Sequence, residues 1–265
     1  MRETIRKILI AVCLVVLCFV SYKVGSFWWE IHNEKQQDEQ IISDYKNSVN
    51  EAETGSEEPE EKAPFTPDAG TYAYMHGVNS DYAGWLKWDS NIINTYLMHP
   101  KAGEEDRYLY NNIYGRRTYG GSAFIDSASS VGECQNLMIY GHSVFATETQ
   151  AMPMMFSPMR NMLDQSYFEA NRTFKIYWEN EIDSYEVFAV SLIDTDTCDW
   201  QYTRSYFDSD EEISEWLSQA KSLSSVAGSV DVSPQDTFVT FQTCMYRTGT
   251  QRVVVTAKKT GSTGY

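Results

Sequence analysis

The stretch that decides the fold is Thr237-Phe-Val-Thr-Phe-Gln-Thr-Cys244, which a turn joins to Arg252-Val-Val-Val-Thr-Ala-Lys258. Both runs are rich in β-branched and aromatic residues, which are typical of strands, and Gly249 lies in the turn between them. We therefore predict a hairpin that brings the Cys244 end of one strand close to the Arg252 start of the other. A guanidinium in that place favours a thiolate and can hold a developing oxyanion through its fork of donors. The alternative is that Cys244 is only a small apolar residue at a strand end.

Short runs of similar composition recur from about Tyr72 almost to the end of the chain, and no internal repeat stands out. The predicted strands are residues 84–88, 92–98, 122–126, 136–140, 173–178, 184–193, 237–243 and 252–258. About eight strands of this kind predict a mainly β fold that closes into a barrel.

Two stretches between these runs have helical character. Residues 152–163 form a short one, in which Pro153 suits the first helical turn. Residues 208–222 form a stronger one, because Ser209 can cap its start and two glutamates follow where negative charge is favoured. The apolar face of this second helix consists of Ile213, Trp216, Leu217 and Ala220.

A histidine ends the run Asn136-Leu-Met-Ile-Tyr-Gly-His142. Gly141 lets the backbone turn sharply after a buried strand, so His142 is well placed to project into a cleft. Imidazoles titrate near neutral pH, which suits general acid and base catalysis. Catalytic cysteine and histidine pairs come from positions far apart in the sequence, so His142 and Cys244 can form such a pair. The alternative is a histidine that only caps a loop.

The first thirty residues indicate a membrane anchor. Basic residues precede an apolar run at residues 8–20, and three aromatic residues follow at 27–29. If Lys23 snorkels towards the head groups, residues 8–29 are long enough to span a bilayer. The basic end then stays in the cytoplasm and the rest of the chain lies outside the cell. A cleaved signal peptide is the competing interpretation, but no convincing small-x-small site precedes Trp28.

The sequence predicts three parts: an anchor at residues 1–29, an acidic spacer at 30–71 and a folded domain at 72–265. Within the spacer, residues 31–49 have helical character, whereas 51–68 have the composition of a flexible, self-repelling chain. Such a spacer holds the folded domain away from the membrane.

The charge of the chain excludes one class of partner. A formal net charge of −16 and a pI near 4.6 leave no basic face to neutralise phosphates, so we expect no nucleic-acid partner. Acidity does not name a substrate, since its main effects are solubility and self-repulsion.

Five cysteines are present, and two of them, Cys13 and Cys18, lie in the predicted anchor as small apolar residues. An odd number remains outside, which leaves at least one free thiol in an extracytoplasmic domain. The sequence does not show whether Cys134 and Cys198 pair, and we interpret both as structural. The histidines are scattered and no Cys-x-x-Cys motif occurs, so we predict no metal site.

Three motifs together resemble the His, TLxTC and Arg signature of the sortases. They are Tyr140-Gly-His142, Thr240-Phe-Gln-Thr-Cys244 and Arg252-Val-Val-Val. The details are similar to class B of that family, in the following segments: Ser80-Asp-Tyr-Ala-Gly-Trp-Leu-Lys87, Arg107-Tyr-Leu-Tyr-Asn, Tyr114-Gly-Arg-Arg, Gly121-Ser-Ala-Phe-Ile-Asp126 and the predicted helix at 208–222. The resemblance implies a closed eight-stranded sortase-type β-barrel with one or more N-terminal helices and a long helix between strands six and seven.

The resemblance also has departures. Gln242 stands where class B enzymes usually have serine, two residues before the cysteine, so substrate contacts there differ. Tyr96 replaces a usual proline. Arg247 is a rival for the arginine role, but Arg252 begins the Val-Val-Val strand, as the arginine of the family does.

The resemblance implies a membrane-anchored cysteine transpeptidase of a Gram-positive bacterium, with Cys244 as nucleophile, His142 as acid and base and Arg252 at the oxyanion. Its partners would be secreted proteins with a C-terminal sorting motif, cleaved after threonine, and an amine of a cell-wall precursor as acceptor. It implies no cofactor, because transfer to an amine conserves the bond type.

The resemblance implies a substrate groove shaped by residues 194–207 and by residues beside the cysteine. The expected contacts are Thr243, Gln242, Met245 and Tyr202. Three other functions compete with this interpretation. One is a pilus-polymerising sortase, in which a pilin lysine is the acceptor. Another is a papain- or NlpC-type peptidase, although those place the cysteine at a helix start and usually before the histidine. The last is a non-catalytic anchored binding module, in which Cys244 is incidental.

Overall fold

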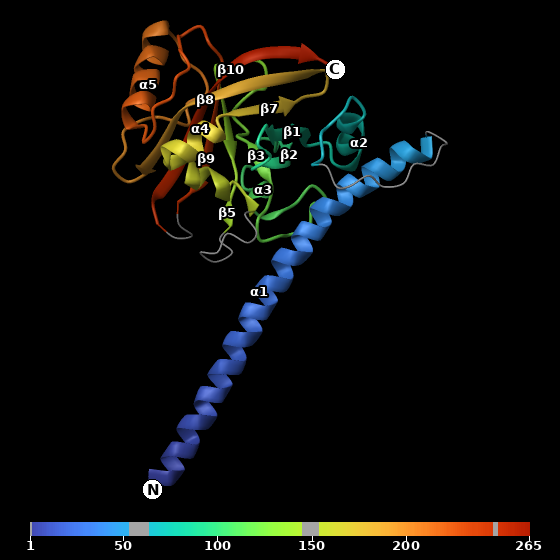
Figure 1. Ribbon diagram of the computed structural model, residues 1–265, viewed down its shortest axis with the longest axis vertical. Coiled ribbons are helices and arrows are strands. Elements are labelled where there is room, and N and C mark those ends of the chain that lie inside the picture. The colour runs from blue at the N-terminus through green and yellow to red at the C-terminus, as the bar shows by residue number, and fades with distance from the viewer. Residues whose placement is uncertain (1, 53–63, 145–153, 246–248) are drawn as a thin grey trace. The chain divides into compact units, whose positions relative to one another are not determined.

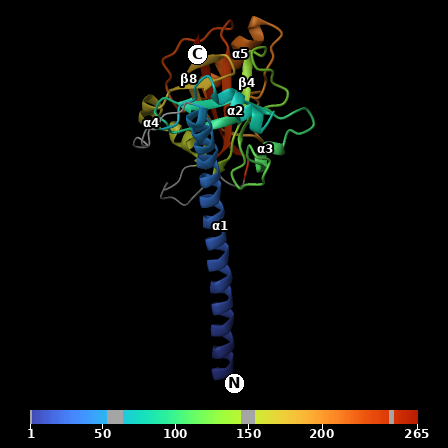
Figure 2. The ribbon, with the colours of Figure 1, turned by 90° about the vertical axis from the view of Figure 1, so that its right-hand side faces the viewer.

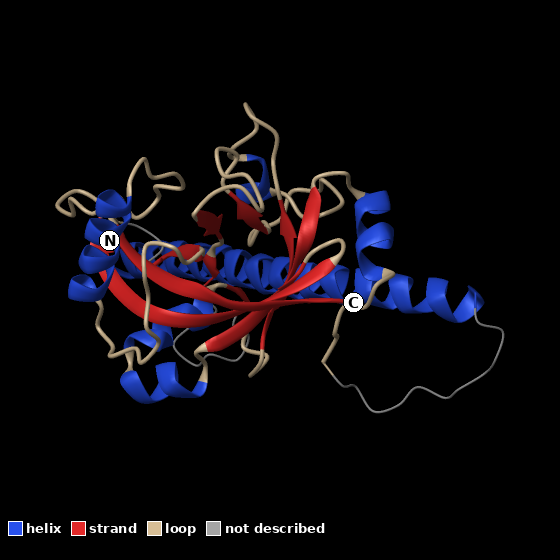
Figure 3. Cartoon of the chain, turned by 90° about the horizontal axis from the view of Figure 1, so that it is seen from above, coloured by secondary structure: helices blue, strands red, loops and turns tan. Residues whose placement is uncertain are grey.

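The computed structural model describes residues 2–52, 64–144, 154–245 and 249–265. The chain divides into two compact units, Met1–Gly55 and Ser56–Tyr265. Figure 3 shows the helical and strand content of the chain, and the strands all belong to the second unit.

The described residues of the first unit form one helix, α1 (Arg2–Ala52). Its segment Arg2–Glu30 has 29 residues, more than the ~20 that a bilayer core requires, and is apolar enough to cross a membrane. A signal sequence would have the same length and composition. The helix continues through residues 31–49, which confirms the helical character predicted there. Much of the flexible segment predicted at 51–68 lies outside the described residues.

The second unit is a closed barrel of eight strands, which confirms the predicted fold class (Figure 1). The strands follow one another around the barrel in the order β1-β2-β3-β4-β9-β10-β8-β7, and β7 pairs with β1 to close it. Their bounds are β1 (Tyr82–Trp88), β2 (Asn94–Met98), β3 (Ala123–Ile125), β4 (Asn136–Tyr140), β7 (Thr173–Tyr177), β8 (Glu181–Asp194), β9 (Phe238–Cys244) and β10 (Gln251–Gly264).

The interior of the barrel is filled by aromatic and β-branched side chains from facing strands. Phe174 lies at its centre, with ring centroids 4.4 Å from Trp88, 5.2 Å from Phe241 and 5.1 Å from Tyr185. All four side chains are buried. Offset and edge-on rings at these distances stabilise the core beyond the area they bury, so the sheet closes around a packed interior.

A second apolar cluster lies outside the barrel, where α5 (Asp210–Leu223) packs against β8 (Figures 1 and 2). The helix follows β8 and precedes β9, the sixth and seventh barrel strands in chain order, as the resemblance implied. The hydroxyl oxygen of Ser209 caps it by accepting from the N–H of Glu212 at 3.3 Å. The predicted apolar face is buried, which confirms the assignment of this helix.

The helix predicted at 152–163 is wrong in type. Met152 and Pro153 lie outside the described residues, Met154–Met155 form the short strand β6, and a 3₁₀ helix, η1 (Ser157–Leu163), follows. β6 pairs with β5 (Ser143–Val144). Pro158 lies at the start of η1, and burial of Met159 and Met162 holds this tight turn against the core.

Three short helices complete the second unit: α2 (Thr71–Val78), α3 (Arg107–Tyr110) and α4 (Gln165–Ala170). Cys134 belongs to the barrel core, whereas Cys198 packs on the outer cluster beside α5. Both are free thiols, so the pairing that the sequence left open does not form.

Candidate active site

The candidate nucleophile lies at the end of β9, on the outer face of the barrel. Side chains alternate along this strand: Phe241 and Thr243 are buried, whereas Gln242 and Cys244 are half-buried. Phe241 belongs to the barrel core, so Cys244, three positions on, faces the other side. The alternation of the strand therefore presents the thiol to the outside.

The two strands beside β9 bring the other candidate residues to the same end of the barrel. In the antiparallel ladder with β10, Arg252 is the direct partner of Cys244. In the parallel ladder with β4, Tyr140 is the partner of Gln242, and the N–H of Gly141 donates to the carbonyl of Gln242 at 3.2 Å. His142 follows immediately, so Cys244 has the histidine strand on one side and the arginine strand on the other.

The ring of His142 is held by the backbone of α3. Its Nε2 lies 2.9 Å from the carbonyl oxygen of Leu109. A carbonyl oxygen only accepts, so Nε2 carries the proton, and in the neutral ring Nδ1 is left as the atom with a free lone pair. The turn before the histidine is tightly packed, because a Cβ on Gly141 would lie 2.5 Å from the ring of Phe156. The sequence therefore needs glycine at this position to let His142 leave the strand.

The guanidinium of Arg252 is oriented by the turn that precedes it. Its Nη1 donates to the carbonyls of Gly249 at 2.8 Å and Gln251 at 3.1 Å. Nearby, the pKa of the Asp194 carboxyl is lowered, first by the Thr250 hydroxyl and more weakly by the charge of Arg252. The turn therefore orders the arginine, which lies on the strand that pairs with the cysteine strand.

Tyr202, from the segment between β8 and α5, covers the same face. Its hydroxyl donates to Oε1 of Gln242 at 2.6 Å. Burial raises the pKa of the Tyr202 phenol, with smaller effects from the neighbouring Arg252, Cys198 and Cys244. The phenol therefore stays protonated and keeps its donor, and it ties the segment to the cysteine strand. The amide nitrogen of Gln242 takes no part in this bond and can donate to another group.

The structure thus brings together five of the seven predicted site residues on one face: Cys244, His142, Arg252, Gln242 and Tyr202. The side chains of Thr243 and Met245 lie elsewhere. Thr243 is buried in the barrel, and Met245 packs against the core while its N–H donates to the carbonyl of Gln251 at 3.1 Å. A contact of Thr243 with substrate would therefore involve backbone atoms. Arg247, the rival arginine, lies outside the described residues.

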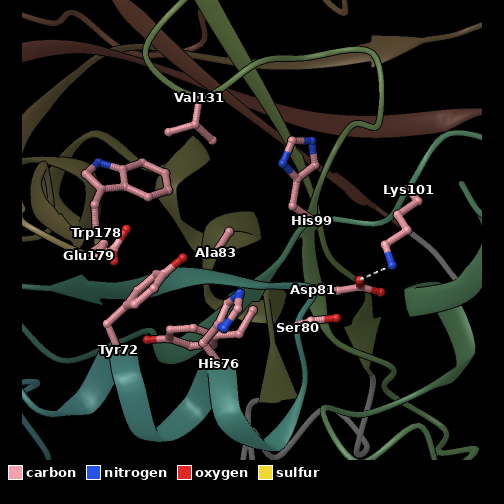
Figure 4. A pocket seen from close by; sticks show the side chains of 11 residues that line it. Tyr72, His76, Ser80, Asp81, Ala83, His99, Lys101, Val131, Trp178 and Glu179 are labelled. Atoms are coloured by element: carbon pink, nitrogen blue, oxygen red, sulfur yellow. Dashed lines mark ion pairs between the residues drawn. The ribbon is translucent and has the colours of Figure 1, made fainter.

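A separate hollow of about 390 Å³ opens beside α2 (Figure 4). In Figure 4, Tyr72 and His76 of α2, His99 and Trp178 are directed towards it. None of the seven predicted site residues lines it. Within the part of the chain that the structure describes, no cluster of three His, Cys, Asp or Glu side chains forms a metal site, here or elsewhere.

The sortase-domain family profile matches residues 94–260, which includes all seven predicted site residues. The chain belongs to the sortase family. This sortase is 25% identical over 258 residues to sortase B of Staphylococcus aureus, with 96% of this chain and 95% of that protein covered. It is 26% identical over 256 residues to sortase B of Listeria monocytogenes, with 92% and 91% covered.

Solved structures agree with this family assignment. A Staphylococcus aureus sortase B–substrate complex has the same fold, with a TM-score of 0.69, 21% identity and coverage of 87% of this chain and 97% of that one. The two sequence relatives come from Gram-positive bacteria, and the predicted class B resemblance is confirmed. In general terms, this sortase is therefore a class B transpeptidase.

Sequence reasoning missed the partner of the sortase's histidine. The carbonyl of Leu109 belongs to a segment 33 residues before His142, and no side-chain chemistry marks it. The one available signal was the family-like block Arg107-Tyr-Leu-Tyr-Asn, whose contribution to the site lies in its backbone.

Proposed function

We propose that this sortase cleaves a C-terminal sorting signal after threonine through a thioester at Cys244, and transfers the protein to an amine of the cell wall. The observation that carries the proposal is the position of Cys244 between the strand that leads to His142 and the strand that begins at Arg252. Nucleophile, proton carrier and oxyanion donor then come from three neighbouring strands of one rigid sheet, as precise positioning requires.

In the first half-reaction, Nδ1 of His142 takes the proton of the Cys244 thiol, and the sulfur attacks the carbonyl carbon of the motif's threonine. The new C–S bond gives a tetrahedral oxyanion, which accepts hydrogen bonds from the guanidinium of Arg252 and a backbone N–H. The C–N bond breaks as His142 donates a proton to the leaving amine. A thioester acyl-enzyme remains, and the C-terminal fragment departs.

In the second half-reaction, an acceptor amine attacks the thioester. Nδ1 of His142, free because Nε2 is held by the Leu109 carbonyl, takes the proton of the attacking nitrogen. The C–S bond breaks, the departing sulfur takes this proton from His142 and becomes a thiol again, and a new amide forms. One amide replaces another, so the cycle needs no external energy source.

The substrate binds on the outer face between β9 and the segment that carries Tyr202. The amide nitrogen of Gln242 offers donors to a polar group of the sorting motif, while the Tyr202 hydroxyl orients that amide at 2.6 Å. The N-terminal helix anchors the enzyme in the membrane through Arg2–Glu30, with its basic start in the cytoplasm and the barrel outside.

The test uses the full chain in detergent micelles with quenched peptides of varied sorting motifs, with and without amine acceptors. Glycine peptides represent the wall amine and a lysine peptide represents a pilin. We expect cleavage after threonine, a thioester mapped to Cys244 by mass spectrometry, and loss of both in Cys244→Ala and His142→Gln. Cys198→Ala is the matched control, because it removes a free thiol that also lies near Tyr202. Normal turnover in Cys244→Ala would refute the proposal.

A further inference from the structure

The turn at residues 107–111, which holds His142, is fixed by hydrogen bonds to its backbone carbonyls. Four consecutive carbonyls of α3 and its end each accept a hydrogen bond, and three of the donors come from the segment 118–122. The bonds are Ser122 N–H to Tyr108 O at 2.8 Å, His142 Nε2 to Leu109 O at 2.9 Å, Thr118 N–H to Tyr110 O at 2.8 Å, and Ser122 Oγ to Asn111 O at 2.8 Å. The Leu109 carbonyl is the one of the four that accepts from the imidazole of His142 and not from the segment 118–122.

Gly121 is what lets the segment approach this turn. It has φ +60°, and a Cβ on it would lie 2.4 Å from the carbonyl oxygen of Tyr108 and 2.6 Å from that of Leu109. Real side chains never come so close to backbone atoms. Any residue other than glycine must therefore displace the turn, and with it the Leu109 carbonyl that His142 bonds.

The same turn is anchored from its other side by Asp81, which is only 6% exposed. Asp81 accepts from the hydroxyl of Tyr108 at 2.8 Å, and it forms ion pairs with Arg107 at 3.6 Å and with Lys101 at 4.0 Å (Figure 4). Burial, together with this carboxylate, raises the pKa of Tyr108, so the phenol remains a donor. Removing one donor from a buried carboxylate costs free energy, because a carboxylate oxygen then loses its hydrogen bond. The bonds to Asp81 therefore resist displacement of the turn.

We propose that Gly121 and Asp81 are positioning residues for the transfer reaction: together they fix the 107–111 turn so that Leu109 holds Nε2 of His142 and Nδ1 faces the reacting atoms. This inference rests on the proposed function, in which His142 moves the proton. Neither residue touches substrate. Each acts through the backbone of α3.

The first test compares Gly121→Ala with Gly115→Ala in the full chain. Gly115 has φ +69°, but a Cβ on it would meet nothing within 4 Å, so both variants carry similar backbone strain and only one displaces the turn. We expect Gly121→Ala to lower kcat at least tenfold with a small change in KM, measured on the best quenched peptide. Gly115→Ala should stay within twofold of wild type. Equal kcat values in the two variants would overturn the inference.

The second test reads the ring of His142 without turnover. The chain has four histidines, so selective ¹⁵N-histidine labelling gives few signals, and His142→Gln assigns the one of interest. Wild type should show the Nε2–H tautomer, and Asp81→Asn should shift this signal towards a mixture. Glu104→Gln is the matched control, because Glu104 pairs with Arg107 in the same place but does not bond Tyr108. An unchanged tautomer in Asp81→Asn would refute the role of the anchor, even if Gly121→Ala fails to fold.

The outcomes separate this inference from the proposed function. If His142→Gln keeps full activity, the proposed function fails, whatever the tautomer. If His142→Gln is inactive while Gly121→Ala and Asp81→Asn match their controls, only the positioning role fails.

Discussion

Arg252 lies directly opposite Cys244 in the antiparallel ladder between β9 and β10. Side chains of such a pair stand on the same face, with Cβ atoms about 4.5–5.5 Å apart. Two carbonyls of the preceding turn hold one end of the guanidinium, Nη1. Its remaining N–H groups make no hydrogen bond to the described residues, so they are available to an oxyanion formed at the carbon that Cys244 attacks.

Arg252→Lys should therefore lower kcat by about 10²–10³, the usual effect of removing one oxyanion donor. Lysine keeps the charge but has no planar fork, so it cannot bond the turn carbonyls and the oxyanion at once. The measurement is kcat on the best quenched peptide. Arg172→Lys, at an ion pair between the residue before β7 and Glu186 of β8, is the control. A loss below tenfold would mean that the oxyanion is stabilised by other groups.

Tyr202→Phe should raise KM about three- to tenfold with little change in kcat, because it removes one hydrogen bond that orients the Gln242 amide, worth ~1 kcal/mol. Gln242→Ser should also raise KM. In the double variant the two effects should not add, since each change removes the same arrangement. A double-mutant cycle on KM tests this coupling, with Tyr206→Phe as the exposed control. Strict additivity would show that the two residues act independently.

Composition alone predicted the barrel because each of its strands buries one apolar face. The predicted bounds of β4 agree with the structure, but those of β10 do not. The last residues of β10, from Thr260 to Gly264, are small and exposed, yet they continue the ladder with β8 down to Glu181. Backbone hydrogen bonds to an existing strand extend β10, and no side-chain pattern marks them.

The candidate site was predictable only where one hairpin brings its residues together. Cys244 and Arg252 are close in sequence and joined by one turn, so a hairpin brings them together. His142 needed the parallel pairing of β4 with β9, which only the resemblance implied. The Leu109 carbonyl and the Tyr202–Gln242 bond depend on where loops pack in three dimensions, and residue types do not encode that.

Ser209→Ala should lower the free energy of unfolding by about 1 kcal/mol, the typical cost of losing a helix N-cap. Its hydroxyl accepts from the Glu212 N–H, and α5 covers the outer apolar cluster behind β8. The shift in the midpoint of urea unfolding measures this cost. Ser214→Ala, on an exposed face of the same helix, is the control and should change the midpoint little. Equal shifts would mean that the cap contributes nothing beyond helix propensity.

Acidification should destabilise the barrel through His99, a half-buried residue after β2. Burial lowers the pKa of the His99 imidazole, and it outweighs the carbonyls of Asp126 and Ser129, which favour the charged ring. In the unfolded chain the ring takes up its proton near pH 6.5, whereas in the folded chain it does so only at lower pH. The unfolded state therefore binds more protons below this value, and stability falls as the pH drops through it.

The measurement is the difference in Tm between pH 7.5 and pH 5.5 for wild type and His99→Gln. Glutamine keeps a donor for the same carbonyls but cannot titrate, so the drop on acidification should be smaller in this variant. His76→Gln, at an exposed histidine of α2, should retain the full drop. If His99→Gln loses as much Tm as wild type, the acid sensitivity does not originate in His99.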